Sequence, residues 1–169
     1  MSLLARDARL GDAAAIALIY NEGIADRIAT FETEPRTAAQ IEGWFDGRHP
    51  IVVVEGPGGD VVAFASTSSY RSRECYAGIA EFSVYVGREH RGVGAGRVAM
   101  TALIEAATAA GFWKLLSRVF PENRASLALM SRMGFREVGT YRRHGKLDGK
   151  WRDCVIIERL LGEAALDTF

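Results

Sequence analysis

The chain has few of the residues that build metal centres, disulfide frameworks or membrane spans. It carries two cysteines and three histidines among 169 residues, and their spacing matches neither zinc-ligand pairs nor a disulfide framework. Cys75 and Cys154 therefore suit a reducing compartment, and we expect a cytoplasmic protein without a metal. We find no signal peptide and no apolar run near the roughly 18 residues that a membrane helix needs.

Net charge is also absent. The 21 lysines and arginines equal the 21 aspartates and glutamates, so no bulk attraction to nucleic acid or to an anionic membrane is expected. Any anion site must therefore be local. A hydrophobic content of 49% in 169 residues fits one soluble domain. We expect a single domain over residues 1–169 with a core from about 3 to 161.

Hydrophobic periodicity predicts alternating strands and helices. The expected strands are 3–7, 51–55, 61–68, 79–86, 114–120 and a final hairpin over 136–161. One expected helix follows Asp12, a second spans 38–46 after Thr37, a third spans 97–110, and a short fourth begins after Asn123. A loop over 23–36 separates the first two. This β-α-α-β-β-β-α-β-α-β-β order predicts an α/β fold with a mixed sheet and helices on both faces.

A glycine-rich turn separates the strand 79–86 from the next helix. It reads Arg91-Gly92-Val93-Gly94-Ala95-Gly96-Arg97. Glycines let the backbone approach a ligand, and the free amides of a helix start attract phosphate, as do flanking arginines. The turn lacks the Gly-Lys-Ser/Thr of a P-loop and the glycine spacing of a dinucleotide turn. A pyrophosphate site formed by all seven residues is the favoured interpretation, and a purely structural turn is the alternative.

The motifs resemble one enzyme family. The Arg91–Gly96 pattern R-x-x-G-x-G is similar to the acetyl-CoA loop of GNAT-type N-acetyltransferases. The blocks 30–35, 80–86, 89–94 and 149–153 resemble the phosphinothricin and arsinothricin N-acetyltransferase branch, so the similarity spans about residues 3–161. The resemblance implies the GNAT acyl-CoA N-acyltransferase fold, acetyl-CoA as co-substrate, a homodimer, and N-acetylation of toxic, glutamate-like amino acids.

Glu81 is the candidate catalytic residue. Acetyl transfer needs a neutral amine, and a carboxylate both attracts the ammonium form and relays its proton. Glu81 lies in an otherwise apolar strand, and the resemblance places it at the position of the general base. A surface-facing glutamate is the alternative. We expect the backbone N–H groups of Val84, Tyr85 and Val86 to stabilise the oxyanion and to contact the cofactor.

Substrate recognition is assigned to two segments. Arg71 and Arg73 stand two residues apart, so an extended backbone would aim both guanidinium groups at one anionic substrate. Glu74 could balance them or receive the substrate ammonium, and a solvated basic loop is the alternative. In the block 30–35, the resemblance implies that Phe31 and Thr33 contact substrate, although an aromatic in a polar loop also packs back on the core.

Three further positions concern the cofactor and the leaving group. Asn123 and Ser126 resemble the second CoA contact of the family, and a simple helix cap is compatible with that role. Asp148 stands where phosphinothricin enzymes have a histidine before Gly149. Met130 stands where many GNATs have a tyrosine acid, so the thiolate has no assigned proton donor.

The sequence leaves the acceptor open. A small acidic amino acid, above all a toxic glutamate mimic, is the leading hypothesis. The alternatives are another amino acid such as methionine sulfone, a peptide N-terminus, or a non-catalytic CoA- or nucleotide-binding module. A base inside the central strand argues against the last of these, because a binding module needs no base.

Overall fold

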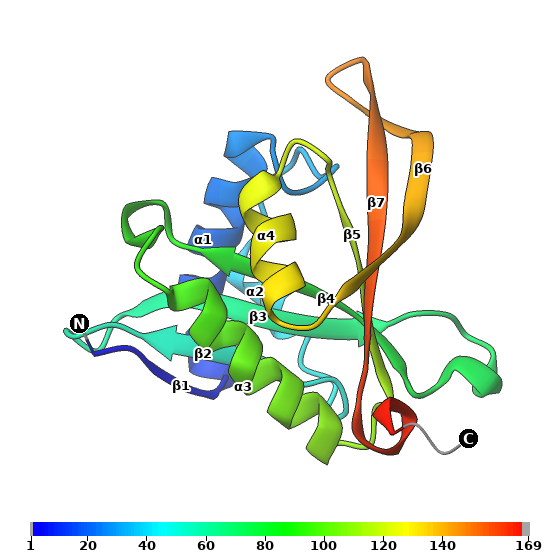
Figure 1. Ribbon diagram of the computed structural model, residues 1–169. Coiled ribbons are helices and arrows are strands. Elements are labelled where there is room, and N and C mark those ends of the chain that lie inside the picture. Colours follow the sequence, from blue (N-terminus) through cyan, green and yellow to red (C-terminus); the bar gives the residue numbers. More distant parts are fainter. Residues whose placement is uncertain (1, 167–169) are drawn as a thin grey trace.

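The chain forms one seven-stranded mixed sheet in the order β1-β2-β3-β4-β5-β7-β6. A computed structural model describes residues 2–166 (Figure 1). Neighbouring strands are antiparallel except for β4 and β5, which are parallel. The strands are β1 (Leu4–Asp7), β2 (Ile51–Glu55), β3 (Val61–Ser69), β4 (Ile79–Val86), β5 (Lys114–Val119), β6 (Arg136–Leu147) and β7 (Lys150–Leu160).

Helices cover both faces of the sheet, as the element order predicted. The helices are α1 (Ala13–Asp26), α2 (Ala38–Glu42), α3 (Ala95–Ala109) and α4 (Arg124–Arg132). Helices α3 and α4 lie on one face, and α1 and α2 on the other (Figure 1). Within residues 2–166, no helix has the length and apolar character required to cross a membrane.

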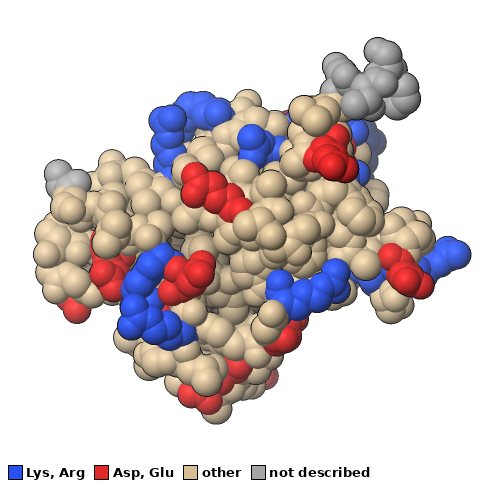
Figure 2. Space-filling view, turned by 90° about the horizontal axis from the view of Figure 1, so that it is seen from below, with Lys and Arg blue, Asp and Glu red and all other residues tan. Residues whose placement is uncertain are grey.

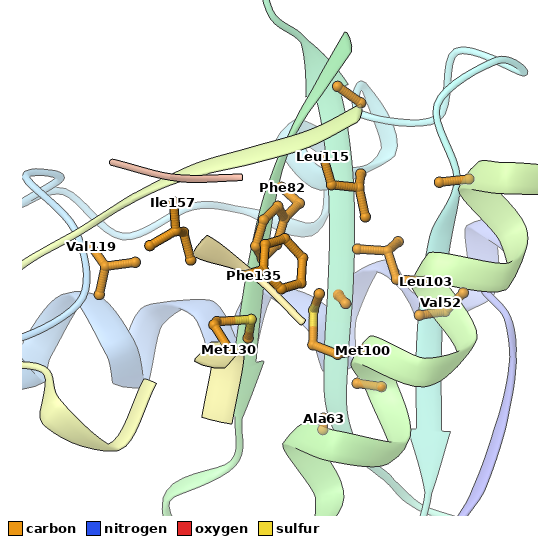
Figure 3. Close-up of a cluster of buried hydrophobic side chains, with 14 of the residues drawn as sticks. Val52, Ala63, Phe82, Met100, Leu103, Leu115, Val119, Met130, Phe135 and Ile157 are labelled. Carbon is orange, nitrogen blue, oxygen red and sulfur yellow. The ribbon is translucent and has the colours of Figure 1, made fainter. Parts of the chain in front are cut away.

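Two buried clusters hold the helices against the sheet. On the α3 and α4 face, Phe82 packs on Phe135 with ring centroids 5.0 Å apart, beside Met100 and Met130 (Figure 3). On the other face, α1 and α2 bury apolar side chains against Phe64 of β3. Because the strands alternate their side chains, residues of β4 contribute to both clusters.

Several element boundaries differ from those expected. Helix α1 continues to Asp26 instead of giving way to a loop at Gly23. A Cβ at Gly23 would lie 2.6 Å from the Tyr85 ring, so this glycine serves close packing within the helix. Helix α2 stops at Glu42, four residues before the expected end, because the chain tightens into turns at Gly43. Helix α3 starts at Ala95, so part of the glycine-rich turn is already helical.

Strands β4 and β5 pair over only three residue positions before they part. The pairing runs from Ile79–Lys114 to Glu81–Leu116. At the closed end, the Gly78 carbonyl accepts a hydrogen bond from the Trp113 amide at 2.8 Å, and the Trp113 ring occupies the space of a side chain at Gly78. Beyond the last pair, the Ser117 hydroxyl donates to the Phe82 carbonyl at 2.8 Å.

The packing at Gly23 predicts the effect of one methyl group. Gly23→Ala should lower the free energy of unfolding by about 1–3 kcal/mol, because the added Cβ overlaps the Tyr85 ring. In an ordinary helix interior the same change stabilises by about 1 kcal/mol, so the expected sign is reversed. Urea unfolding measures the change. Gly11→Ala is the control because a Cβ there meets nothing within 4 Å, and equal midpoints for both variants would contradict the prediction.

Candidate active site

The cleft between β4 and β5 exposes backbone donors. The Gly87 amide donates to Val62 of β3, whereas the Phe82 carbonyl accepts from Ser117 of β5. Since backbone groups alternate along a strand, Val84 and Val86 direct their N–H groups toward β5, where the strand ladder has ended. The Tyr85 amide faces β3 instead. The expected donors thus reduce to Val84 and Val86.

Residues from four elements line this cleft. Val84 and Tyr85 come from β4, and Asn123 and Ser126 come from the start of α4, so the structure brings these predicted cofactor residues together. The Asn123 side-chain oxygen accepts the Ser126 amide at 3.3 Å, which confirms the helix cap. Met130, only 1% exposed, closes the inner wall, and its thioether cannot donate a proton to a leaving group.

The glycine-rich turn has the geometry of a helix-start anion site. Gly92 and Gly94 adopt φ values of +80° and +91°, which side chains rarely tolerate. Gly94 is the N-cap of α3, so the amides of Ala95, Gly96 and Arg97 have no intrahelical acceptor. Gly96 plays a different part, because a Cβ there would lie 3.2 Å from Leu129 of α4.

An acidic residue fastens this turn to α1. Asp26, the last residue of α1, accepts from Arg88 and from Arg91, each at 2.8 Å. These hydrogen bonds, the one from Arg88 first, lower the pKa of Asp26. Arg91 therefore anchors the turn with its side chain, while Arg97 is exposed and makes no ion pair within residues 2–166. The sequence analysis missed Asp26, which lies 65 residues from Arg91.

Glu81 lies at the last paired position of β4, on the α1 and α2 face. On the neighbouring strand β3, Ser68 pairs with Glu81 and Ser66 pairs with Ser83. A row of short polar side chains therefore leads to the Glu81 carboxylate. Arg118 of β5 places one Nη2 atom 3.2 Å from both carboxylate oxygens of Glu81. The Glu81 side chain is 26% exposed and its ion pair with Arg118 lies at the surface, so its role as a base stays a prediction beside the alternative of a surface-facing glutamate. Arg118 was not among the predicted site residues.

A cavity of about 440 Å³ opens on the same face. Ser66, Ser68 and Ser83 contribute its floor, and aromatic side chains of α1, β4 and the segment after α2 contribute its walls. The complete lining is Tyr20, Glu32, Arg36, Gly43, Trp44, Asp46, Ser66, Thr67, Ser68, Ser69, Ser83 and Tyr85. Its volume falls within the range of small-molecule sites, about 300–1,000 Å³.

The segment after β3 is not extended, so that expectation is wrong. Strand β3 ends at Ser69, the backbone bends at Ser72 and Arg73, and Glu74 starts a short 3-10 turn (Glu74–Tyr76). Arg71 and Arg73 are exposed, and neither forms an ion pair with Glu74. The Arg71 guanidinium stacks on the Tyr70 ring at 5.0 Å. Both arginines nevertheless follow Ser68 and Ser69, which line the cavity.

The block 30–35 is divided between packing and solvent. Phe31 meets Phe120 edge to face at 4.9 Å and lies against Gly145 and Leu147, so the packing alternative is confirmed. Thr33 is exposed. Asp148 stands where phosphinothricin enzymes have a histidine. It forms an ion pair with Arg27 at 3.0 Å, which links the hairpin of β6 and β7 to the end of α1.

The charge distribution is mixed and local. Acidic and basic side chains lie next to one another on the face in Figure 2, separated by neutral surface, as the zero net charge leads one to expect. Within residues 2–166, no group of three or more potential metal ligands comes together. The site therefore consists of a backbone-lined cleft, a helix-start turn and one ion pair.

Comparison with known families decides what this arrangement is. The acetyltransferase (GNAT) family matches residues 16–135. The chain belongs to the GNAT family. The predicted relationship is thus confirmed, and with it the fold and the class of enzyme, an N-acetyltransferase.

Similar proteins are named for amino-acid acetylation. A methionine sulfoximine/methionine sulfone acetyltransferase from Pseudomonas aeruginosa is 34% identical over 162 residues, with 94% of each chain covered. A phosphinothricin N-acetyltransferase from Streptomyces coelicolor is 32% identical, with 85% of this chain and 87% of the relative covered. A solved phosphinothricin acetyltransferase from Sinorhizobium meliloti, in complex with acetyl-CoA, superposes with a TM-score of 0.89 at 31% identity, covering 96% of this chain and 90% of that one.

Proposed function

We propose that this GNAT enzyme uses acetyl-CoA to acetylate the α-amino group of a small acidic amino acid. The sharpest form of the proposal is a toxic glutamate mimic, phosphinothricin or arsinothricin, whose acetylation confers resistance. One observation carries it: the Glu81 carboxylate lies where β4 and β5 part, beside backbone N–H groups that have lost their strand partner. The names of the relatives support the class of acceptor.

The cofactor fits the cleft and the turn. The amides of Ala95, Gly96 and Arg97 at the start of α3 would hold the pyrophosphate, with Gly92, Val93 and Gly94 shaping the turn. The pantetheine would run along β4 toward Asn123 and Ser126. Val84 and Val86 would then direct their N–H groups at the thioester.

Proton transfer and acyl transfer follow from these positions. Glu81 takes a proton from the acceptor ammonium, directly or through water, and the amine nitrogen attacks the thioester carbonyl carbon. The carbon–nitrogen bond forms, the carbon–sulfur bond breaks, and the Val84 and Val86 N–H groups stabilise the oxyanion between these events. The attacking nitrogen gives up its second proton to water as the amide forms, and, because Met130 offers no proton, the departing thiolate takes one from water.

The acceptor site combines the cavity with the segments that border it. Arg71 and Arg73 would bind the anionic group of the acceptor side chain. Glu74 would either bind the ammonium of the acceptor or balance the charge of the two arginines. Phe31 and Thr33 flank Glu32, which lines the cavity, and are proposed as further acceptor contacts although neither belongs to the lining itself. This assignment rests on the cavity that Ser68 and Ser69 line immediately before the two arginines.

The alternatives keep different parts of this scheme. The Pseudomonas relative favours methionine sulfoximine or methionine sulfone as acceptor, with the same base and cofactor. A peptide N-terminus would need an open path for a chain beyond the α-carbon. A non-catalytic CoA-binding module would leave the carboxylate of Glu81 at the parting of β4 and β5 without a use.

We also propose a cytoplasmic homodimer. Strand β6 is a sheet edge of 12 residues, and its side chains are almost all exposed, including Val138 at 48% and Tyr141 at 53%. A long exposed edge with apolar side chains is a template for pairing with a second copy. Cys75 and Cys154 are both free thiols, which suits a reducing compartment.

The first prediction tests the turn. Gly94→Val should raise the acetyl-CoA dissociation constant at least about tenfold, because a β-branched residue resists the positive φ that points the amides outward. Isothermal titration measures the constant. Gly111→Val is a matched control, since Gly111 has the same φ of +91° at the other end of α3 with nothing within 4 Å of a Cβ. Equal affinity in both folded variants would remove the turn from the site.

The second prediction tests the base. Glu81→Gln keeps the size of the side chain but cannot accept a proton, so kcat should fall about 100-fold or more. Acetyl-CoA affinity should stay within about twofold of the parent, because the cofactor contacts lie on other residues. Steady-state release of free thiol measures kcat. A variant as active as the parent across the pH range would show that Glu81 is a strand residue without a catalytic role.

The third prediction tests the acceptor. Arg73→Lys keeps the charge but loses the two-pronged guanidinium, so KM for phosphinothricin should rise about tenfold with little change in KM for acetyl-CoA. Kinetics with phosphinothricin, glutamate, methionine sulfone and an uncharged amine compare the acceptors directly. Equal kcat/KM for all four, or no response of any to Arg73→Lys, would contradict an anion-reading acceptor site.

A further inference from the structure

The ion pair between Glu81 and Arg118 is loose and incomplete. A single Nη2 atom of Arg118 lies 3.2 Å from each oxygen of Glu81, whereas charge-assisted pairs are commonly about 2.7–2.9 Å long. The Arg118 side chain is 48% exposed and makes no other ion pair within residues 2–166. Most of the donors of this guanidinium therefore remain available to a ligand.

This pair creates a conflict for an ordinary amine. An ammonium that approaches Glu81 meets the positive charge of Arg118, which competes with it for the same two carboxylate oxygens. Arg118 would then lose the ion-pair partner that it has at the wall of the cleft, which Ser117, Asn123 and Ser126 also line. A peptide N-terminus or a simple amine brings no negative charge next to its nitrogen, so it leaves the displaced cation unpaired.

A free α-amino acid resolves the conflict, because its carboxylate is attached to the carbon that bears the ammonium. We propose that Glu81 and Arg118 together read this zwitterion: Glu81 receives the ammonium and Arg118 exchanges Glu81 for the α-carboxylate. One internal ion pair is replaced by two pairs with the acceptor, so neither charge is left without a partner. The inference rests on the proposed function and narrows its acceptor to free α-amino acids.

The division of labour follows from position. Arg118 projects from β5 at the cleft, two residues beyond the last β4–β5 pair, and reaches the reacting end of the acceptor. Arg71 and Arg73 lie beyond the end of β3, next to the cavity lining, and remain for an anion on the acceptor side chain. Arg118 is thus a specificity-determining residue at the α-carboxylate and does not compete with the other two.

Matched acids and amides test the inference. Methionine sulfone and phosphinothricin are each compared with their α-carboxamide, which keeps the shape and the amine but removes the carboxylate charge. In the parent enzyme, kcat/KM should favour each acid over its amide by about tenfold to a hundredfold. Arg118→Gln should lower kcat/KM for the acids by about that factor and leave the amides within about twofold. For the acids, kcat/KM of Arg118→Lys should lie between that of the parent enzyme and that of Arg118→Gln, because lysine supplies the charge without the two-pronged guanidinium.

The contrary outcomes are distinct. An equal loss for acids and amides in Arg118→Gln would show that Arg118 only orients Glu81, and no loss for either would show that it has no role. Either result overturns the inference while the proposed function stands. A parent enzyme that acetylates none of the four compounds would overturn the proposed function as well.

Two controls keep the comparison interpretable. Arg132→Gln removes an exposed arginine of α4 that makes no ion pair within residues 2–166, and it should leave the acid-to-amide ratio unchanged. Thermal unfolding and acetyl-CoA titration of each variant establish that fold and cofactor site persist. If Arg118→Gln does not fold, Arg118→Lys still decides the question, because an unchanged acid-to-amide ratio in that variant contradicts a carboxylate contact.

Discussion

The short parallel pairing of β4 and β5 is the constraint on which the site depends. A buried strand that loses its partner leaves N–H and C=O groups unsatisfied, which is costly unless other groups replace the ladder. Ser117 replaces one bond at Phe82 with its side chain, and the N–H groups of Val84 and Val86 remain open to the cleft. Glu81 stands at the last residue pair before this opening. The sheet thus places a carboxylate and backbone donors close together without any dedicated loop.

Local patterns made part of this structure predictable. Alternation and helical spacing identified the order of strands and helices, and the glycine spacing identified the turn before α3, because these signals arise between residues close in sequence. A loop was wrongly predicted to begin at Gly23, because the glycine is required by the ring of Tyr85, which lies on another element and not nearby in the sequence. Arg118 lies 37 residues from Glu81, so no local pattern indicates that they pair. Contacts of this kind appear only when the fold is known.

The anion site in the turn depends on backbone more than on charge. Arg91 looked like a phosphate ligand, yet its guanidinium is engaged by Asp26 and helps to hold the turn in place. The lowered pKa of Asp26 means that this attachment is intact above the pKa of an unfolded aspartate and weakens as the pH falls through the folded value. In the proposed phosphate site, the arginine would act through geometry, by fixing the positions of amides that carry no net charge.

The closed end of the cleft has a consequence for the size of the transferred group. Trp113 fills the space beside Gly78, and its amide donates to the Gly78 carbonyl at the start of the β4–β5 pairing, three residue pairs before the cleft opens. The strands therefore cannot spread apart at this end to admit a longer chain. An acyl group larger than acetyl has to find its room among side chains, chiefly at Met130, whose unbranched thioether adapts its shape more readily than an aromatic ring would. In the proposed binding mode, room for a longer acyl chain would thus depend on one flexible side chain set against a backbone frame.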